Sequence, residues 1–293
     1  DLASMARALA LFRREKPDVL LLNDQRECRV IAPSAALAGV KVRVQRKGWP
    51  YLRGSWRDRL VYGRFVTHVF GNSLQVQEIF RERSGLPPER VAFYPNGFDL
   101  DRFPIPDRAG RRESREGPRR AITIGAAGRL VSQKGYDVLV EALAKLKERG
   151  LSFSVEVAGE GPERESLEGR ARSLGVSDLL AFRGRVEDIP GFLAELDIFV
   201  FPSRTEGRSN ALAEAMCSGL SIAASDIPGN CELIEHEKTG LLFPPDDPAA
   251  LAGAMERLIG DRALSAELGA NARSFAEAEL DEREIMDRIE AYL

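Results

Sequence analysis

The sequence has few of the residues that build metal centres and disulfide frameworks. Its three cysteines, Cys28, Cys217 and Cys231, show no paired spacing, so neither a disulfide framework nor a zinc cluster is predicted. The two histidines, His68 and His236, lie far apart and have no neighbouring pattern of ligand residues. We therefore expect free thiols in a reducing compartment, no metal and no cofactor.

Long apolar runs are also missing. The longest, such as VLLL (19–22) and IFVF (198–201), have the length of strands and fall far below the roughly 20 residues of a membrane-spanning helix. No secretory signal is recognisable, and a cytoplasmic location is expected. The chain opens inside a helical pattern without a starting methionine. We expect that a segment precedes it.

The net charge of −3 conceals an uneven distribution of charge along the chain. Residues 1–120 carry 24 Lys and Arg against 14 Asp and Glu, whereas residues 121–293 carry 18 against 31. The densest basic stretch, 41–64, holds eight cations, one acid and four aromatic residues of the Trp and Tyr types. Such a mixture suits an anionic membrane surface, a phosphate-bearing partner or nucleic acid, and a solvated face with core aromatics explains it as well. The acidic second half argues against nucleic acid.

Short apolar runs alternate with longer amphipathic ones, which predicts an α/β fold with parallel sheets covered by helices on both faces. In the first half we predict strands at 18–22, 40–44, 67–71 and 91–94 and helices near 25–38, 55–65 and 73–84. In the second half we predict strands at 121–128, 153–158, 179–183, 197–201, 221–224 and 240–243 and helices near 136–150, 162–174, 188–195, 210–218, 248–259 and 262–279. Six strands make a complete doubly wound domain, and four leave the first domain incomplete.

A polar, charged stretch rich in Pro and Gly separates the two halves. The predicted organisation is therefore a first Rossmann-like domain, a linker, a second Rossmann-like domain and a C-terminal helix that packs back toward the first domain. The corresponding ranges are 1–100, 101–120, 121–280 and 281–293.

Two loops of the second domain are candidates for chemistry, because ligands of doubly wound sheets bind beyond the carboxyl ends of the strands. The first is GAAGRLVSQKG (125–135), which matches neither a dinucleotide fingerprint nor a P-loop. It nevertheless supplies Arg129 and Lys134, a planar fork and a point charge that together suit a diphosphate. Taken singly, each is as well explained as a surface charge.

The second candidate loop is EGRSNALAEAM (206–216), which leads into a predicted buried helix. The free N–H groups at the start of this helix favour an anion, while Glu206 and Glu214 can accept hydrogen bonds from hydroxyl groups. A glycosidase acid and base pair is rejected, because both carboxylates face one side of a ligand. A nucleotide sugar, which carries a diphosphate and many hydroxyls, satisfies both loops.

Residues 199–251, which contain the pair Glu206 and Glu214 in an E-x7-E pattern, resemble the donor-binding half of GT-B glycosyltransferases of the retaining family-4 type. Four further blocks match that family in the expected order: VAFYPNGFDLDRF (91–103), GRLVSQKGYDVLVEAL (128–143), VAGEGPERESLE (157–168) and FRGRV (182–186). The resemblance covers essentially the whole chain and implies the GT-B fold, two Rossmann-like doubly wound domains of which the N-terminal one is incomplete here.

The resemblance also implies roles for individual residues. Arg129 and Lys134, beside Gly128, would hold the donor diphosphate and stabilise it as the leaving group, and with Glu206 they would be the catalytic residues. Glu214 would accept the ribose hydroxyls and Glu206 would contact the transferred sugar. The other donor-binding residues implied are Arg185 and Val186 beside the base, and Ser209, Asn210 and Ala211 at sugar and phosphate. In the first domain, Arg46, Lys47 and Trp49 are assigned to the acceptor or membrane side.

The implied activity is transfer of a sugar from a nucleotide-diphosphate donor, without a metal, to a glycan or lipid-linked acceptor in cell-envelope polysaccharide synthesis, at the inner membrane face. Two alternatives stay open: a nucleotide-sugar epimerase of the same fold, and a non-catalytic fragment that binds nucleotide sugar. The chain departs from the family by lacking the opening strand and glycine-rich loop, by Arg208 in place of an aromatic residue, and by the missing proline after Gly219.

Overall fold

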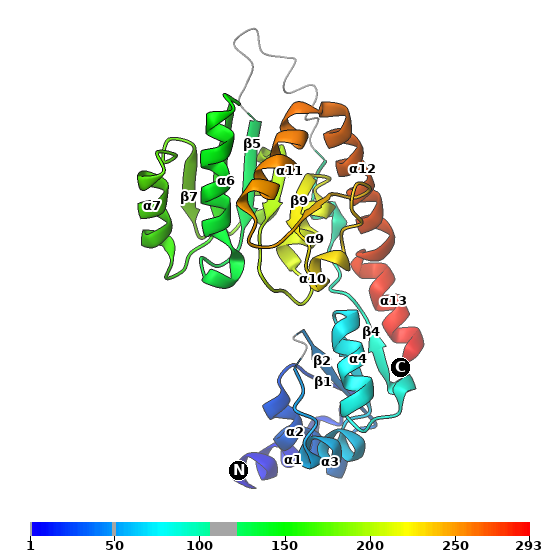
Figure 1. Ribbon diagram of the computed structural model, residues 1–293. Helices are drawn as coiled ribbons and strands as arrows, with labels where there is room; N and C mark the ends of the chain where they lie inside the picture. Colours follow the sequence, from blue (N-terminus) through cyan, green and yellow to red (C-terminus); the bar gives the residue numbers. More distant parts are fainter. Residues whose placement is uncertain (1, 49–50, 106–121) are drawn as a thin grey trace. The chain divides into compact units, whose positions relative to one another are not determined.

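The protein forms two compact units, each built around a parallel sheet (Figure 1). The structure is a computed structural model that describes residues 2–48, 51–105 and 122–293. The first unit contains Asp1–Asn96 together with Ile285–Leu293, and the second contains Gly97–Glu284. Most of the predicted linker, and Trp49, lie outside the described residues.

The first unit has a four-stranded parallel sheet in the order β1-β2-β3-β4. Its main core packs Cys28, Tyr62, Phe80 and Val69 between the sheet and its helices. The strands are β1 (Val19–Leu22), β2 (Val42–Lys47), β3 (His68–Gly71) and β4 (Val91–Phe93), and the helices are α1 (Leu2–Glu15), α2 (Gln25–Ala38), α3 (Trp56–Phe65), α4 (Leu74–Arg83) and the short η1 (Pro88–Arg90).

The second unit has a six-stranded parallel sheet in the order β10-β9-β8-β5-β6-β7. The order reverses between β5 and β8, which is where ligands of such sheets bind. The strands are β5 (Ile122–Ala127), β6 (Phe153–Ala158), β7 (Leu180–Gly184), β8 (Ile198–Phe201), β9 (Ser221–Ser225) and β10 (Leu241–Phe243).

Helices cover both faces of this second sheet. Neighbouring residues of β8 belong to different cores: Val200 packs with α6 (Tyr136–Glu148) and α11 (Pro248–Gly260), and Phe199 packs with α8 (Ile189–Glu195) and α9 (Asn210–Cys217). Because successive strand residues point to opposite faces, a strand covered on both sides is apolar throughout, and all four residues of IFVF are buried. The other elements are α7 (Arg164–Ser173), α10 (Pro228–Cys231), α12 (Arg262–Glu279), η2 (Leu100–Arg102) and η3 (Ser132–Lys134).

The last helix, α13 (Glu282–Tyr292), carries the C-terminal residues of the first unit. The ring of Tyr292 makes edge-on contacts with His68, Phe70 and Tyr94, at centroid distances of 5.5, 5.8 and 5.9 Å. Its hydroxyl donates to the carbonyl of Glu89. The segment from the end of the chain thereby completes the packing beside β3 and β4.

The predicted α/β class, and each predicted strand and helix, are confirmed apart from shifts at their ends. The largest shift is in the second strand, predicted at 40–44 and observed as Val42–Lys47. It continues through three polar residues, because Gln45, Arg46 and Lys47 pair with β3 and pairing outweighs their low strand propensity. The short helices α10, η1, η2 and η3 were not predicted.

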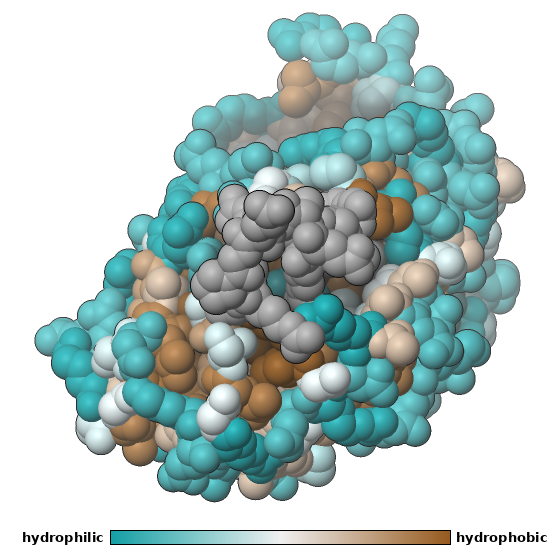
Figure 2. All heavy atoms as spheres, turned by 90° about the horizontal axis from the view of Figure 1, so that it is seen from above, coloured by the Kyte–Doolittle hydropathy of each residue, from teal (hydrophilic) through white to brown (hydrophobic). Residues whose placement is uncertain are grey.

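Hydrophilic residues cover most of the face drawn in Figure 2, and hydrophobic ones gather in smaller groups between them. Among the described helices, none combines the length and the apolar character needed to cross a membrane.

Candidate functional site

A pocket of about 420 Å³ opens at the carboxyl end of the second sheet. Seven of the predicted donor-binding residues line it: Gly128, Arg129, Arg185, Val186, Asn210, Ala211 and Glu214. Five further residues complete the wall: Ala127, Ala158, Gly159, Glu160 and Ile189. Residues that are up to 87 positions apart in the sequence thus meet in one cavity, at the reversal of strand order where the fold class predicts a ligand.

The floor of the pocket is backbone from the ends of β5 and β6. Gly128 and Gly159 both have φ of 149°, a conformation that side-chain-bearing residues rarely adopt. A Cβ on Gly159 would overlap the carbonyl oxygen of Gly128, so the backbone segments that follow β5 and β6 lie in direct contact. Gly128 N–H donates to Ala158 over 2.9 Å and fixes this contact. The two glycines therefore leave room for a ligand directly above the sheet.

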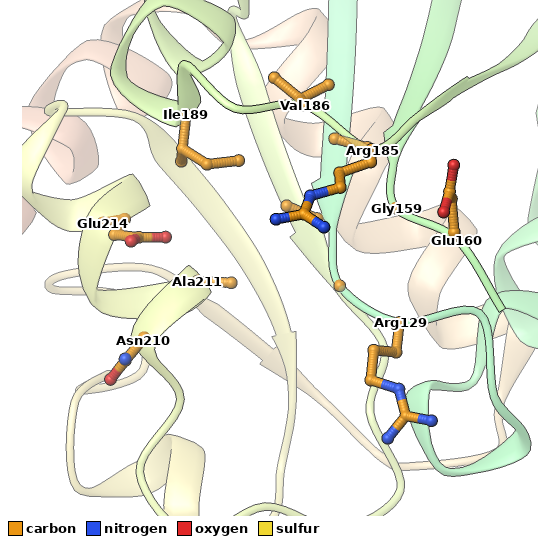
Figure 3. A pocket seen from close by; sticks show the side chains of 12 residues that line it. Arg129, Gly159, Glu160, Arg185, Val186, Ile189, Asn210, Ala211 and Glu214 are labelled. Carbon is orange, nitrogen blue, oxygen red and sulfur yellow. The ribbon is translucent and has the colours of Figure 1, made fainter.

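Two guanidinium groups lie on one side of the pocket (Figure 3). Arg129 follows β5, and Arg185 follows β7 and points into the space between the strands and α9. Within the part of the chain that the structure describes, neither group forms an ion pair with a carboxylate. Because unpaired cations are available to a ligand, this side of the pocket favours an anion.

The opposite side of the pocket is the N-terminal half of α9. Ser209 is the N-cap residue in an extended conformation, and its side chain makes no capping hydrogen bond. The first backbone N–H groups of a helix have no partner within it, and here Asn210 and Ala211 line the pocket. This helix start adds a second preference for negative charge.

Glu214 brings a carboxyl group into the same pocket from the second turn of α9. Its neighbours Ala213 and Ala215 are buried in the core, which fixes the direction of the helix. Burial raises the pKa of Glu214 to about 7, against the opposing effect of Arg102. Near neutral pH this carboxyl group can therefore donate or accept a hydrogen bond, depending on its protonation.

Lys134 and Glu206 do not line this pocket but meet each other. Lys134 Nζ donates to Glu206 Oε1 over 2.6 Å and lies 5.0 Å from the ring centre of Phe201. Lys134 ends η3 and Glu206 follows β8, so the pair joins the two loops that the sequence singles out. The pairing itself was not predicted, because the sequence assigns the two groups to different parts of a ligand.

The residues predicted for the acceptor or membrane side belong to the first unit. Arg46 is exposed and donates to the side chain of Asn96, and Lys47 ends β2. Trp49 lies outside the described residues.

Sequence reasoning missed Glu160 and Ile189 as pocket residues. Glu160 lies in the block VAGEGPERESLE, for which the family resemblance implies no role for any single residue. Ile189 begins α8, and an apolar residue at a helix start carries no signal that distinguishes a pocket wall from core. Among the described residues, no group of three or more His, Cys, Asp or Glu side chains is arranged to hold a metal ion.

The sequence model described as "Glycosyl transferases group 1" matches residues 109–275. The chain belongs to this family. A GDP-mannose-dependent alpha-(1-6)-phosphatidylinositol monomannoside mannosyltransferase of Mycobacterium tuberculosis is 33% identical over 204 residues, which are 66% of this chain and 53% of the relative. A putative colanic acid biosynthesis glycosyltransferase of Escherichia coli, WcaL, is 32% identical over 180 residues, 58% of this chain and 42% of the relative. The chain thus spans about half the length of the curated relatives it matches.

The fold is that of GT-B glycosyltransferases, two Rossmann-like α/β domains, as predicted. A crystal structure of HepE from Anabaena in complex with UDP has a TM-score of 0.84 with 24% identity, over 98% of this chain and 80% of that protein. The group 1 family membership predicted from the sequence motifs is confirmed as well.

Proposed function

We propose that this protein is a retaining glycosyltransferase that moves a sugar from a nucleotide-diphosphate donor to a glycan or lipid-linked acceptor. The observation that carries the proposal is the pocket of the second unit, where the guanidinium groups of Arg129 and Arg185 lie opposite α9, whose N-terminus and Glu214 carboxyl group line the same cavity. Such a pocket suits a ligand that is both anionic and rich in hydroxyls. The curated relatives are named as glycosyltransferases, which agrees with this ligand class.

In this proposal the diphosphate lies near Arg129 and the start of α9, and the ribose hydroxyls donate to Glu214. The base lies beside Arg185 and Val186. Beyond the diphosphate, the sugar reaches toward Glu206, and Lys134 shares its charge between that carboxylate and the phosphate. The related HepE was crystallised with UDP-glucose, which supports a nucleotide sugar as the ligand class.

The proposed reaction breaks the bond between the anomeric carbon and the diphosphate oxygen. Negative charge grows on the leaving diphosphate, and fixed cations beside it stabilise that charge without having to reorganise. We propose that the side chains of Arg129 and Lys134, together with the helix start, take the place of a metal ion. Retention follows if the acceptor attacks from the side of the leaving group, whose phosphate then accepts the acceptor's proton.

A second part of the proposal is contact with an anionic membrane through α3 of the first unit. Trp56 and Leu60, one turn apart, have exposed fractions of 71% and 55%. Arg57 lies over the ring of Trp56, and Arg53 and Arg59 are also exposed. Aromatic and aliphatic side chains surrounded by arginines suit an anionic bilayer surface at the cytoplasmic face.

A sedimentation assay with vesicles tests this contact. The protein should sediment with phosphatidylglycerol vesicles at low salt, and the double variant Trp56→Ala, Arg57→Ala should show a lower bound fraction. Equal binding to uncharged vesicles would contradict the charge argument.

Two other functions fit the same pocket: a nucleotide-sugar epimerase, which needs no acceptor, and a protein that only binds nucleotide sugar. Binding does not separate these from a transferase, but products do. An epimerase changes the sugar without an acceptor, whereas a transferase releases nucleoside diphosphate in proportion to glycosylated acceptor. A protein that only binds nucleotide sugar catalyses neither of these two reactions.

The first test is a thermal-shift titration with UDP, GDP and ADP and their sugars, with and without EDTA. A ligand at about 100 times its Kd adds about 2.7 kcal/mol to the free energy of unfolding. We expect a shift for one base, unchanged by EDTA and reduced in Arg129→Ala. If no nucleotide shifts the transition, the donor site proposed here is wrong; if EDTA abolishes the shift, the metal-free part is wrong.

A further inference from the structure

Two loops at the carboxyl ends of the neighbouring central strands β5 and β8 are joined by a series of specific contacts. One loop runs over 131–135 and includes η3, and the other runs over 202–206. The N–H of Arg204 donates to the carbonyl of Gln133 over 2.8 Å, and Gln133 Nε2 donates to the carbonyl of Thr205 over 2.8 Å. At one end of the series, Lys134 meets Glu206. The loops therefore form one structural unit that presents Lys134 and Glu206 together.

The side chain of Arg204 is the centre of this unit. Its guanidinium binds Asp137 with two parallel hydrogen bonds, of 2.9 and 2.7 Å, from α6. The same group donates to the carbonyl of Ser132 in η3 and, through Nε, to Asp246 over 2.7 Å. The side chain of Arg204 is 27% exposed and that of Asp137 is 32% exposed. One side chain thus connects three segments and satisfies a backbone carbonyl of the loop that carries Lys134.

Two observations indicate that this arrangement is held firmly. Asp246 adopts a φ of 59°, in the left-handed region that residues with a side chain occupy where the surrounding contacts hold them there. Burial acts to raise the pKa of Asp137, yet the hydrogen bonds from Arg204 outweigh it and hold that pKa below its ordinary value. Bidentate arginine–carboxylate pairs are geometrically specific, and lysine cannot reproduce them.

We infer that Arg204 is a positioning residue, which sets the place of Lys134 relative to Glu206 through its contacts with Ser132, Asp137 and Asp246. Arg204 itself does not line the pocket. Its effect on a ligand therefore passes through η3 and falls on the end of the ligand that meets Lys134. The inference rests on the proposed function for the identity of that ligand, a nucleoside diphosphate, but not for the contacts themselves.

The test compares Arg204→Lys with Arg170→Lys. Arg170 of α7 donates one hydrogen bond to Glu141 of α6, the helix that also carries Asp137, so Arg170→Lys alters an arginine–carboxylate pair outside the two loops. Amide hydrogen exchange without ligand is measured on peptides that cover 131–136. We expect faster exchange there in Arg204→Lys, unchanged exchange in β5 and β8, and no such effect in Arg170→Lys. Equal exchange in the two variants would overturn the inference.

A second readout separates positioning from general loss of stability. UMP and UDP, and GMP and GDP, are titrated into the native protein and both variants below their unfolding transitions. A misplaced Lys134 should weaken diphosphate binding about tenfold, which corresponds to about 1.4 kcal/mol, while monophosphate binding changes little. Equal weakening of both would show that Arg204 acts on the whole fold and would overturn the inference.

A double-mutant cycle supplies the remaining check. If Arg204 acts through Asp137, the losses of diphosphate affinity in Arg204→Lys and Asp137→Asn do not add in the double variant. Additive losses would contradict this path. Should the native protein bind no nucleotide at all, the proposed function fails, and the exchange experiment still decides whether Arg204 holds η3.

Discussion

Lys134 Nζ lies 2.6 Å from Glu206 Oε1, and the two side chains are only 18% and 10% exposed. This ion pair joins residues 72 positions apart. The carboxylate satisfies the lysine that we assign to the diphosphate. A donor must therefore share or displace that bond, and the two residues cannot be treated as independent contributors to binding and catalysis.

The pair gives opposite predictions for binding and for turnover. In Glu206→Gln the charge of Lys134 is no longer neutralised by a carboxylate, so we expect nucleoside diphosphate to bind more tightly by roughly threefold to tenfold. Turnover should nevertheless fall by about 10²-fold, because the proposed contact with the transferred sugar is lost. Calorimetric titration and initial rates measure the two effects, and weaker diphosphate binding in this variant would contradict the shared-charge argument.

Removal of Arg129 should affect the reaction more than the fold. Losing one fixed donor to developing charge typically costs 10²–10³ in rate, and we expect Arg129→Ala to lose that much in kcat. Arg129 is exposed, so its replacement should leave the unfolding transition close to that of the native protein. Arg149→Ala, which removes a surface partner of Glu256, is the control for loss of charge. Near-normal turnover in Arg129→Ala would refute its assignment to the leaving group.

The affinity for a nucleotide sugar should depend on pH through Glu214. Burial raises the pKa of this carboxyl group to about 7, so the carboxyl group is increasingly protonated below pH 7. If ribose hydroxyls donate to the carboxylate, its pKa is lower in the complex, and binding releases a proton. Affinity should then rise with pH up to about 7 and level off above it.

Glu214→Gln supplies the control for this pH dependence. A nucleotide sugar is the ligand of choice, because its diphosphate has no ionisation near neutral pH. The variant should bind more weakly and lose the rise in affinity between pH 6 and 8, as isothermal titration calorimetry can measure. A pH profile that survives the substitution would assign the dependence to another group.

Gly159 should be among the glycines least tolerant of substitution. A methyl group there would overlap the carbonyl of Gly128, and its φ of 149° is strained for any residue with a side chain. Gly150 also has a positive φ, 71°, but nothing lies within 4 Å of its Cβ position. We expect Gly150→Ala to lose about 1–2 kcal/mol of unfolding free energy and Gly159→Ala to lose clearly more. Urea denaturation compares them, and equal losses would show that the backbone contact relaxes easily.

The strands and helices could be predicted because local patterns determine them. The strand IFVF is apolar at every position, since helices cover both of its faces. The end of β2 could not be predicted in this way. Gln45 is polar and fully buried, and it belongs to the strand because its backbone pairs with that of Val69. Propensity carries no information about that pairing.

The candidate site was predicted in part, for a related reason. Motif resemblance found Arg129 and Glu214, whose loops follow strands in a recognisable order. It did not find that Lys134 bonds to Glu206, or that Arg204 binds Asp137, because both contacts depend on how two loops far apart in sequence meet. Arg204 lies in the block 199–251, two residues before Glu206, but nothing in the sequence pairs it with Asp137 rather than with any other carboxylate.

The ring of Tyr292 packs among His68, Phe70 and Tyr94, although more than 190 residues of chain separate it from the nearest of them. On the ribosome, the residues up to Asn96 emerge before the second unit, and the nine residues Ile285–Leu293 that complete the first unit emerge after it. Domains generally fold as they are synthesised, N-terminal ones first. Here the first unit is completed only after the second has been made, so Phe70 and its neighbours stay uncovered by that tyrosine until α13 has been synthesised.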